Sequence, residues 1–253
     1  MTADPRAQSF DSAAAQYATS RPSYPAELFD TVEEFAGRPL AGARVADVGA
    51  GTGIASALLR ERGAEVIAVE PGAAMAGEFR RALPGVPVVR GDGNALPLAP
   101  ASCDLITYAQ SWQWTDPRRS VPEALRVLRA DGALAIWWNT TAFDVPWIAE
   151  QHERIARHCG VEPKSAVRPT DDEAVRLSGL TGLRVARRQL RWSRTVPLDT
   201  HLANLGSRSA FLVLAEADRR AFFVEERARL GGLFPRGEVE EVYVVDLLVA
   251  LRP

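Results

Sequence analysis

The sequence of 253 residues has few cysteines and no long apolar run. Cys103 and Cys159 are too few for a disulfide framework and have no partners at metal-ligand spacing, so we predict no metal site and a reducing, cytoplasmic compartment. The longest apolar stretch, Ala133 to Trp138, is far shorter than the roughly 18 residues of a membrane-spanning helix. The first residues carry no apolar segment, so we expect neither a secretory signal nor a membrane partner.

An excess of basic charge is also absent. Thirty basic residues, among which Lys164 is the only lysine, stand against 32 acidic residues, and the net charge is −2. A chain without a basic field has little to hold a polyanion, so nucleic acid is not an expected partner. A hydrophobic fraction of 47% is that of an ordinary globular protein with a sizeable core.

A regular alternation of short β-branched runs and helical stretches is present between Arg44 and Asn139. Strands are predicted over 44–48, 65–69, 86–89, 104–108 and 133–138, with helices over 54–62, 73–83 and 118–129. Such alternation is typical of parallel βαβ units in a doubly wound sheet. After Asn139 the pattern changes to predicted helices over 145–159, 200–205 and 215–230, with a polar connector after Gly160.

We therefore predict an α/β fold, a doubly wound, Rossmann-like and mostly parallel seven-stranded sheet with a helical cap. The whole chain, 1–253, is expected to be a single domain. Its core would comprise about 40–140 and two late strands at about 183–192 and 241–251. The cap would be formed by an N-terminal arm, 1–36, and by helices at about 145–180 and 199–231.

A glycine-rich loop connects the first strand directly to a helix. Gly49, Gly51 and Gly53 let the backbone turn sharply and let a ligand approach main-chain amides at the helix N-terminus. Glu70 ends the second strand about 20 residues after Gly49, where an acidic residue accepts hydrogen bonds from a ribose diol. Asp92 follows the third strand and would either accept from an adenine amine or form an Asx turn. The pattern indicates a nucleoside-binding crevice.

The charges around this crevice distinguish between possible nucleosides. Asp47, Glu70 and Asp92 would surround it, and the loop from Asp47 to Ile54 contains no lysine or arginine. Carboxylates repel a pyrophosphate and suit a positively charged ligand. The third glycine also comes one residue earlier than in the dinucleotide fingerprint, which disfavours an NAD-dependent oxidoreductase. The predicted cofactor is S-adenosylmethionine, which carries a sulfonium and an ammonium group.

Several motifs together resemble the class I S-adenosylmethionine-dependent methyltransferases, and within them the small-molecule group that includes the trans-aconitate methyltransferases. The matching segments are 45–53, Glu70-Pro71, 91–97, 109–116, 123–132 and the N-terminal Tyr17-x-x-x-Arg21-Pro22-x-Tyr24-Pro25. The resemblance covers about residues 8 to 140. Its motifs are specific for the cofactor and poor for the substrate.

The resemblance implies a set of cofactor contacts. Gly49, Gly51, Gly53 and Gln110 would lie on the methionine side and Glu70 at the ribose, while Met75, which follows Pro71, would lie near the adenine, with Asp92, Gly93 and Asn94 around the base. The chain departs from the group at one position, since Gln113 stands where the group often has histidine. A neutral amide there argues against a general-base role.

The N-terminal arm and a loop after the fourth strand supply further candidates. Tyr17, Arg21 and Tyr24 would fold over the crevice, with Arg21 pairing with the cofactor carboxylate, or else lie in an extended surface arm. Trp112 and Trp114 follow the fourth strand, where the crevice of an open sheet lies. Their rings would either face the cofactor cation or anchor the cap in the core.

Two groups of polar side chains are assigned structural roles. Arg187, Arg188, Arg191 and Arg194 alternate along a predicted strand and are expected to form a solvated face, with an anionic substrate as the minor alternative. His201 lies at a helix start with no visible partner and is not expected to bind a metal.

We expect a methyltransferase acting on a small-molecule acceptor, through a carboxylate, hydroxyl, amine or carbon, as a monomer or homodimer. A hydroxyl or carbon acceptor would need a base, and Tyr17, Tyr24 and Gln113 are the candidate catalytic residues. The alternative is a non-methylating protein of the same fold, a cyclase or binding protein that keeps the cofactor as a scaffold. The glutamine at position 113 keeps this alternative open.

Overall fold

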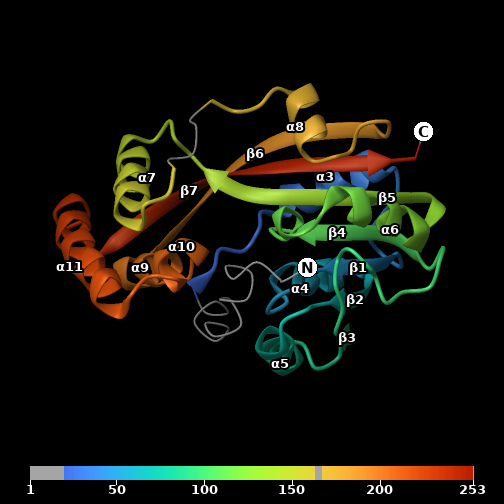
Figure 1. Ribbon diagram of the computed structural model, residues 1–253, viewed down its shortest axis with the longest axis horizontal. Helices are drawn as coiled ribbons and strands as arrows, with labels where there is room; N and C mark the ends of the chain where they lie inside the picture. Colours follow the sequence, from blue (N-terminus) through green and yellow to red (C-terminus); the bar gives the residue numbers. More distant parts are fainter. Residues whose placement is uncertain (1–19, 163–166, 253) are drawn as a thin grey trace. The chain divides into compact units, whose positions relative to one another are not determined.

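The structure, a computed structural model, describes residues 20–162 and 167–252 (Figure 1). The chain divides into two compact units. The sheet unit comprises 23–139, 169–190 and 245–252, and the helical unit comprises the described residues of 20–22, 140–168 and 191–244. The single-domain interpretation stays a prediction.

Seven strands form one sheet, as the sequence predicted. They are β1 (Arg44–Val48), β2 (Glu65–Val69), β3 (Val88–Val89), β4 (Cys103–Ala109), β5 (Leu128–Thr141), β6 (Arg184–Pro197) and β7 (Glu238–Leu251). The strand order is β3-β2-β1-β4-β5-β7-β6, and the pairs among the first five strands are parallel. The predicted fold class is confirmed. Because β1 lies between β2 and β4, the order reverses there, which is where open α/β sheets bind their ligands.

Helix α3 was not predicted from the sequence, and α8 and α10 were not predicted individually, although they lie within the helical regions predicted at about 145–180 and 199–231. In the sheet unit lie α3 (Ala26–Ala36), α4 (Ile54–Glu61), α5 (Ala73–Ala82), the 3-10 turn η1 (Trp112–Trp114), α6 (Pro117–Val127) and α8 (Asp171–Leu177). In the helical unit lie α7 (Pro146–Cys159), α9 (Leu198–Gly206), α10 (Ser209–Leu212) and α11 (Glu216–Leu233). Within the described ranges, none of these helices combines the length and apolar content that a bilayer crossing requires.

Helix α3 belongs to the sheet unit, although the sequence predicted an arm over this stretch. The helix starts after Pro25 and ends at Gly37, whose φ of 67° terminates it. Leu28, Phe29 and Val32 are buried along one face. The proline-rich segment before this helix favoured an extended arm, but the apolar spacing inside it produces an amphipathic helix.

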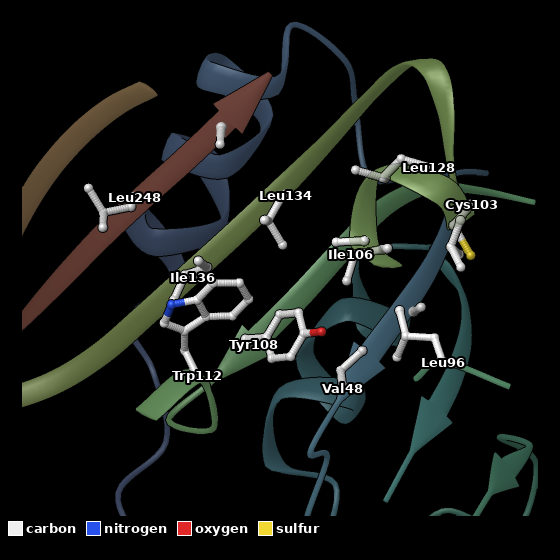
Figure 2. Packing of buried hydrophobic residues seen from close by; sticks show 14 of the residues in the cluster. Val48, Leu96, Cys103, Ile106, Tyr108, Trp112, Leu128, Leu134, Ile136 and Leu248 are labelled. Carbon is white, nitrogen blue, oxygen red and sulfur yellow. The ribbon is translucent and has the colours of Figure 1, made fainter. Parts of the chain in front are cut away.

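The core of the sheet unit explains why its strands show no alternation of apolar and polar residues. The interior strands are covered on both faces, so nearly every side chain of β1, β4 and the central part of β5 is buried. Figure 2 shows Ile106, Tyr108, Leu134 and Ile136 packed together from neighbouring strands. The loops at the strand ends are therefore where we expect polar groups to be accessible to a ligand.

Candidate functional site

The glycine loop between β1 and α4 is held by close packing at two of its three glycines. All three have positive φ angles, 67° at Gly49, 57° at Gly51 and 96° at Gly53. A Cβ on Gly49 would lie 2.5 Å from the Cβ of Ser111, and one on Gly53 would lie 2.7 Å from Leu83. At Gly51 no described atom lies within 4 Å of that position. The loop therefore needs glycine for packing at its ends and borders open space at its middle.

Glu70 brings the end of β2 into contact with this loop. Its side chain is almost buried, and Oε2 accepts a hydrogen bond of 2.8 Å from the Gly51 amide. Oε1 accepts one of 2.7 Å from the Gly72 amide. A carboxylate oxygen has two lone pairs, so each can accept a second donor such as a ribose hydroxyl. Beside it, Arg90 donates to the Pro71 carbonyl.

Asp92 and Asn94 form a rigid turn after β3. Asp92 Oδ1 accepts from both the backbone and the side-chain amide of Asn94, each at 2.9 Å, which is the geometry of an Asx turn. Asn94 Oδ1 in turn accepts from the Asp116 amide at 2.7 Å. The hydroxyl of Tyr108 donates to the carbonyl of Gly93 at 3.1 Å. Because Oδ2 of the exposed Asp92 accepts no hydrogen bond from the described residues, the turn is compatible with a ligand contact.

Asp47 does not face the crevice, and the prediction of three carboxylates around it is wrong in this respect. Its side chain is fully buried, and its oxygens accept from the hydroxyls of Ser56, at 2.6 Å, and Thr107, at 3.0 Å. Burial raises the pKa of this carboxyl, against the effect of the two hydroxyls. Asp47 therefore ties β1 to α4 and β4, and Glu70 and Asp92 are the remaining acidic residues of the site.

The loop after β4 contains a strained residue that is held by several hydrogen bonds. Gln110 is not a glycine but has a φ of 61°, and its amide donates to the Trp137 carbonyl at 2.9 Å. Gln113 Nε2 donates to the Gln110 carbonyl at 2.7 Å, while Gln113 Oε1 accepts from the Trp138 indole at 2.8 Å. Strained backbone of this kind is concentrated at functional sites. Gln113 braces the turn and, as a neutral amide, does not titrate.

Trp112 lies in the core of the sheet unit. Only 3% of its surface is exposed, and its indole donates to the Ser178 carbonyl at 3.1 Å. Its ring meets that of Tyr108 edge-on, with 4.7 Å between the centroids (Figure 2). This position corresponds to a core anchor, which was the alternative to a cofactor contact.

The remaining predicted residues are distributed over both units. Met75 is buried in α5 and follows the exposed Pro71, so both stay near the end of β2. Tyr24 belongs to the sheet unit, and its ring meets that of the buried Trp137 edge-on at 5.7 Å. Arg21 belongs to the helical unit, and Tyr17 lies outside the described residues.

The four arginines that the sequence assigned to a solvated face of β6 are each paired with a carboxylate: Arg187 with Asp246, Arg188 with Glu34, Arg191 with Asp144 and Arg194 with Glu241. Arg187 and Arg194 are largely buried, against the prediction, whereas Arg188 and Arg191 keep 39% and 50% of their side-chain surface exposed. The acidic partners come from segments far away in the sequence, so the strand pattern alone could not reveal them.

A buried polar network in the helical unit was also missed. His201 contacts Glu241 Oε1 through Nδ1 at 2.7 Å and the Gln151 amide through Nε2 at 3.0 Å. Glu226 accepts from Gln151 and from Arg154. Across the described ranges, no group of histidine, cysteine and acidic side chains could hold a metal ion.

Glu241 is the centre of this network. Burial raises the pKa of its carboxyl, but hydrogen bonds from His201 and Asn204 and the charge of Arg194 outweigh burial and lower the pKa to about 2. The hydroxyl of Tyr243 donates to Oε2 at 2.8 Å. The carboxylate is therefore held ionised in the interior of the unit.

Comparison with known proteins shows that the segment from β1 to β5 is similar to a methyltransferase domain. Residues 46–136 match the family described as methyltransferase domain. An uncharacterised methyltransferase of Mycobacterium tuberculosis is 42% identical over 149 residues, which is 59% of each protein. The chain therefore matches about three fifths of the length of this relative.

Solved structures extend the similarity to nearly the whole chain. A putative type II methyltransferase from Anaeromyxobacter dehalogenans is 25% identical with a TM-score of 0.63, over 92% of this chain and 97% of that one. A phosphoethanolamine N-methyltransferase of Haemonchus contortus, solved with phosphomonomethylethanolamine and S-adenosylhomocysteine, is 14% identical with a TM-score of 0.54, over 96% of this chain and 57% of that one. The second likeness shows the fold alone.

Proposed function

We propose that this chain, a member of the class I S-adenosylmethionine-dependent methyltransferases, transfers a methyl group from S-adenosylmethionine to a small organic acceptor. Membership of the family, which the sequence predicted, rests on the match over 46–136 and on the shared fold. The narrower likeness to the trans-aconitate group stays a prediction. The observation that carries the proposal is the contact between Glu70 and the glycine loop at the point where the strand order reverses.

The crevice fits a nucleoside without phosphates. In dinucleotide-binding folds, free amides at the start of the helix receive the pyrophosphate. Here the Gly51 amide already donates to Glu70, so a diphosphate would meet a carboxylate instead of a free donor. Open space beside Gly51 leaves room for a ligand, and the negative charge of Glu70 suits a cationic one.

The cofactor would supply an electrophilic methyl group on a positively charged sulfur. The residues of the chain would bind and orient it, with Glu70 accepting from the ribose hydroxyls and Asp92 from the adenine amine. The braced turn at Gln110 would lie on the methionine side. Orientation and exclusion of water would then provide most of the rate enhancement. Gln113 would not act as a general base, because a neutral amide does not titrate near neutral pH.

A small acceptor is supported by the charge of the chain. The net charge of −2 provides no field for a nucleic-acid substrate. On β6, where a row of arginines could have formed a basic patch, four of the five guanidinium groups are paired with a carboxylate. These pairs reduce the positive potential that a polyanion would need.

Calorimetric titration tests the cofactor. We expect S-adenosylmethionine and S-adenosylhomocysteine to bind and NAD not to bind. In Glu70→Gln the affinity for both should fall about tenfold or more, since a charge-assisted hydrogen bond to the ribose becomes a neutral one. Glu65→Gln, at the exposed opposite end of β2, is the matched control and should bind like the wild type. Binding of NAD without binding of S-adenosylmethionine would refute the proposal.

The alternative is a non-methylating cofactor-binding protein, favoured by the engagement of both ends of the Gln113 amide within the protein. Incubation with methyl-labelled cofactor and fractionated small metabolites distinguishes the two. Labelled product together with S-adenosylhomocysteine supports methyl transfer. Tight cofactor binding with no S-adenosylhomocysteine from any fraction supports the alternative.

A further inference from the structure

A cavity of about 590 Å³ lies at the edge of the sheet opposite the crevice, and every residue that lines it belongs to the sheet unit. We call it the amino-end cavity, because its lining includes the first residues of three parallel strands, Arg44 of β1, Glu65 of β2 and Cys103 of β4. The glycine loop and Glu70, by contrast, follow the last residues of β1 and β2. Because β1 has five residues, the cavity and the crevice are about 15 Å apart.

The walls of the amino-end cavity are mainly apolar. They come from β2 and from the segments that precede β3 and β4, and include Val66, Ile67, Val86, Pro87, Pro97 and Leu98. Pockets that bind small molecules measure roughly 300–1,000 Å³ and combine apolar walls with a few polar groups. The amino-end cavity has this size and this composition, so it can receive the apolar body of a small ligand.

Arg60, in the last turn of α4, provides a positive charge at this cavity. A Cβ on Gly85 would lie 3.4 Å from Nη2 and 3.5 Å from Nη1 of Arg60, so the guanidinium lies across the Gly85 backbone at the cavity wall. Among the described residues the guanidinium has no carboxylate or carbonyl partner. Exposed arginines without a described partner occur elsewhere, such as Arg80 at the end of α5, but Arg80 does not line the cavity.

The other charges of the lining nearly cancel. Arg44 Nε lies 3.7 Å from Glu65 Oε2, and the two side chains are 56% and 71% exposed. Such an exposed pair is weak, but its charges are equal and opposite. Burial raises the pKa of the Cys103 thiol, which therefore stays neutral near neutral pH. The lining has one positive charge in excess, at Arg60, and this excess suits a ligand with a single negative charge.

We propose that the amino-end cavity is a second binding site, separate from the crevice, for a small amphipathic carboxylate. The apolar body of the ligand lies along the walls, and its carboxylate accepts two parallel hydrogen bonds from the planar guanidinium of Arg60. The single excess charge favours a carboxylate over a phosphate group, which carries a charge of about −1.5 to −2. The site lies at the far end of α4, the helix that begins at Gly53 of the glycine loop.

Calorimetric titration of the full chain with octanoate, acetate and octanol, at an ionic strength fixed with chloride, tests the two parts of the ligand. Octanoate should bind. Acetate, which lacks the apolar body, should bind about tenfold more weakly or less, and octanol, which lacks the charge, about fivefold more weakly. No binding of octanoate, or equal binding of octanol, would overturn the proposal. Tighter binding of octyl phosphate than of octanoate would overturn the choice of a carboxylate.

Substitution of Arg60 tests the charged contact. Arg60→Gln should bind octanoate about fivefold more weakly than the wild type. Arg80→Gln is the matched control, since it removes the same charge from the exposed end of another helix, and it should bind octanoate like the wild type. Both variants should keep the melting temperature of the wild type. Unchanged octanoate affinity in Arg60→Gln, or an equal loss in both variants, would overturn the proposal.

Two changes of charge at the lining test the position of the carboxylate. Glu65→Gln frees Arg44 from its acidic partner and should raise the affinity for octanoate about twofold. Ala99→Glu adds a carboxylate at an exposed lining residue and should lower the affinity about fivefold, whereas Ala82→Glu, exposed on α5 outside the lining, should leave it unchanged. Unchanged affinity in Ala99→Glu would show that octanoate binds elsewhere and would overturn the proposal.

Titration of octanoate in the presence of saturating S-adenosylhomocysteine separates the amino-end cavity from the crevice. The affinity for octanoate should stay within about twofold, because the two places lie at opposite ends of the strands. Competition between the two ligands would place octanoate in the crevice and overturn the proposal. If S-adenosylhomocysteine itself fails to bind, the proposed function fails, whereas the results for Arg60→Gln and Ala99→Glu still decide the second site.

Discussion

The crevice of the sheet unit and the polar interior of the helical unit are built from different kinds of interaction. In the crevice, Glu70 accepts from backbone amides of a local loop, and Asp92 and Asn94 close their own turn. In the helical unit, Glu241 and His201 join side chains that lie about 40 residues apart in the sequence. Local backbone contacts create the proposed cofactor site, which a short motif can reveal. Long-range contacts between charged side chains create an interior that no motif reveals.

Among the substitutions that test this comparison, we expect the largest loss of stability and of cofactor binding from one at Gly49. In Gly49→Ala the new Cβ clashes with Ser111 at 2.5 Å and the residue keeps a φ of 67°. Overpacking and left-handed strain together should cost about 4 kcal/mol of unfolding free energy and abolish cofactor binding. Urea denaturation and calorimetry would measure the two effects.

Gly42→Ala is the matched control for this prediction. Gly42 has a φ of 73°, but nothing lies within 4 Å of its Cβ position, so the cost should be about 1 kcal/mol from strain alone. Equal losses of unfolding free energy in Gly49→Ala and Gly42→Ala would show that the close packing of Gly49 against Ser111 contributes nothing to stability.

The next largest loss of unfolding free energy is expected in the helical unit, from a substitution at Glu241. Glu241→Gln leaves Arg194 without its buried counter-charge and should lower the unfolding free energy by about 3 kcal/mol. The exposed neighbour Glu240 provides the control, since Glu240→Gln should change stability by less than about 0.5 kcal/mol. Cofactor binding by folded Glu241→Gln should match that of the wild type if the two regions are independent, and a marked loss would contradict the comparison.

The lowered pKa of Glu241 also predicts how the free energy of unfolding depends on pH. The pKa of Glu241 is lowered from 4.5 to about 2 in the folded protein, so its contribution is present above the unfolded value and is lost as the pH falls between these limits. Denaturation from pH 6 to pH 2 should show a smaller loss in Glu241→Gln than in the wild type. Parallel curves for the two proteins would contradict the prediction.

The sequence predicted all seven strands and the glycine loop because each depends on neighbouring residues. It could not place Asp47 correctly, since a strand buried on both faces gives no sign of which side each residue faces. Helix α8 was not predicted individually although Thr170 and Glu173 form a capping box, because seven residues in a proline- and aspartate-rich segment give too little periodicity. The partners of His201 depend on tertiary packing and leave no local pattern.

The smallest loss of stability is expected from a substitution at Gln113. Gln113→Ala removes the two hydrogen bonds that brace Gln110, so the strained turn should loosen and stability should fall by about 1 kcal/mol. Cofactor affinity should decrease while its pH profile stays unchanged, since no titratable group is lost. Gln113→Glu, which keeps an acceptor for Trp138, should retain more affinity than alanine. A new pH dependence in Gln113→Ala would contradict a purely positioning role.

The central claim is that Glu70, held against the Gly51 amide, receives a nucleoside that carries no phosphates. A crystal structure of the protein with S-adenosylhomocysteine tests this claim most directly, through the distances from the Glu70 oxygens to the ribose hydroxyls. The account predicts hydrogen bonds of about 2.5–3.0 Å to one or both hydroxyls. A ribose beyond hydrogen-bond reach of Glu70, with the glycine loop displaced from its carboxylate, would contradict it.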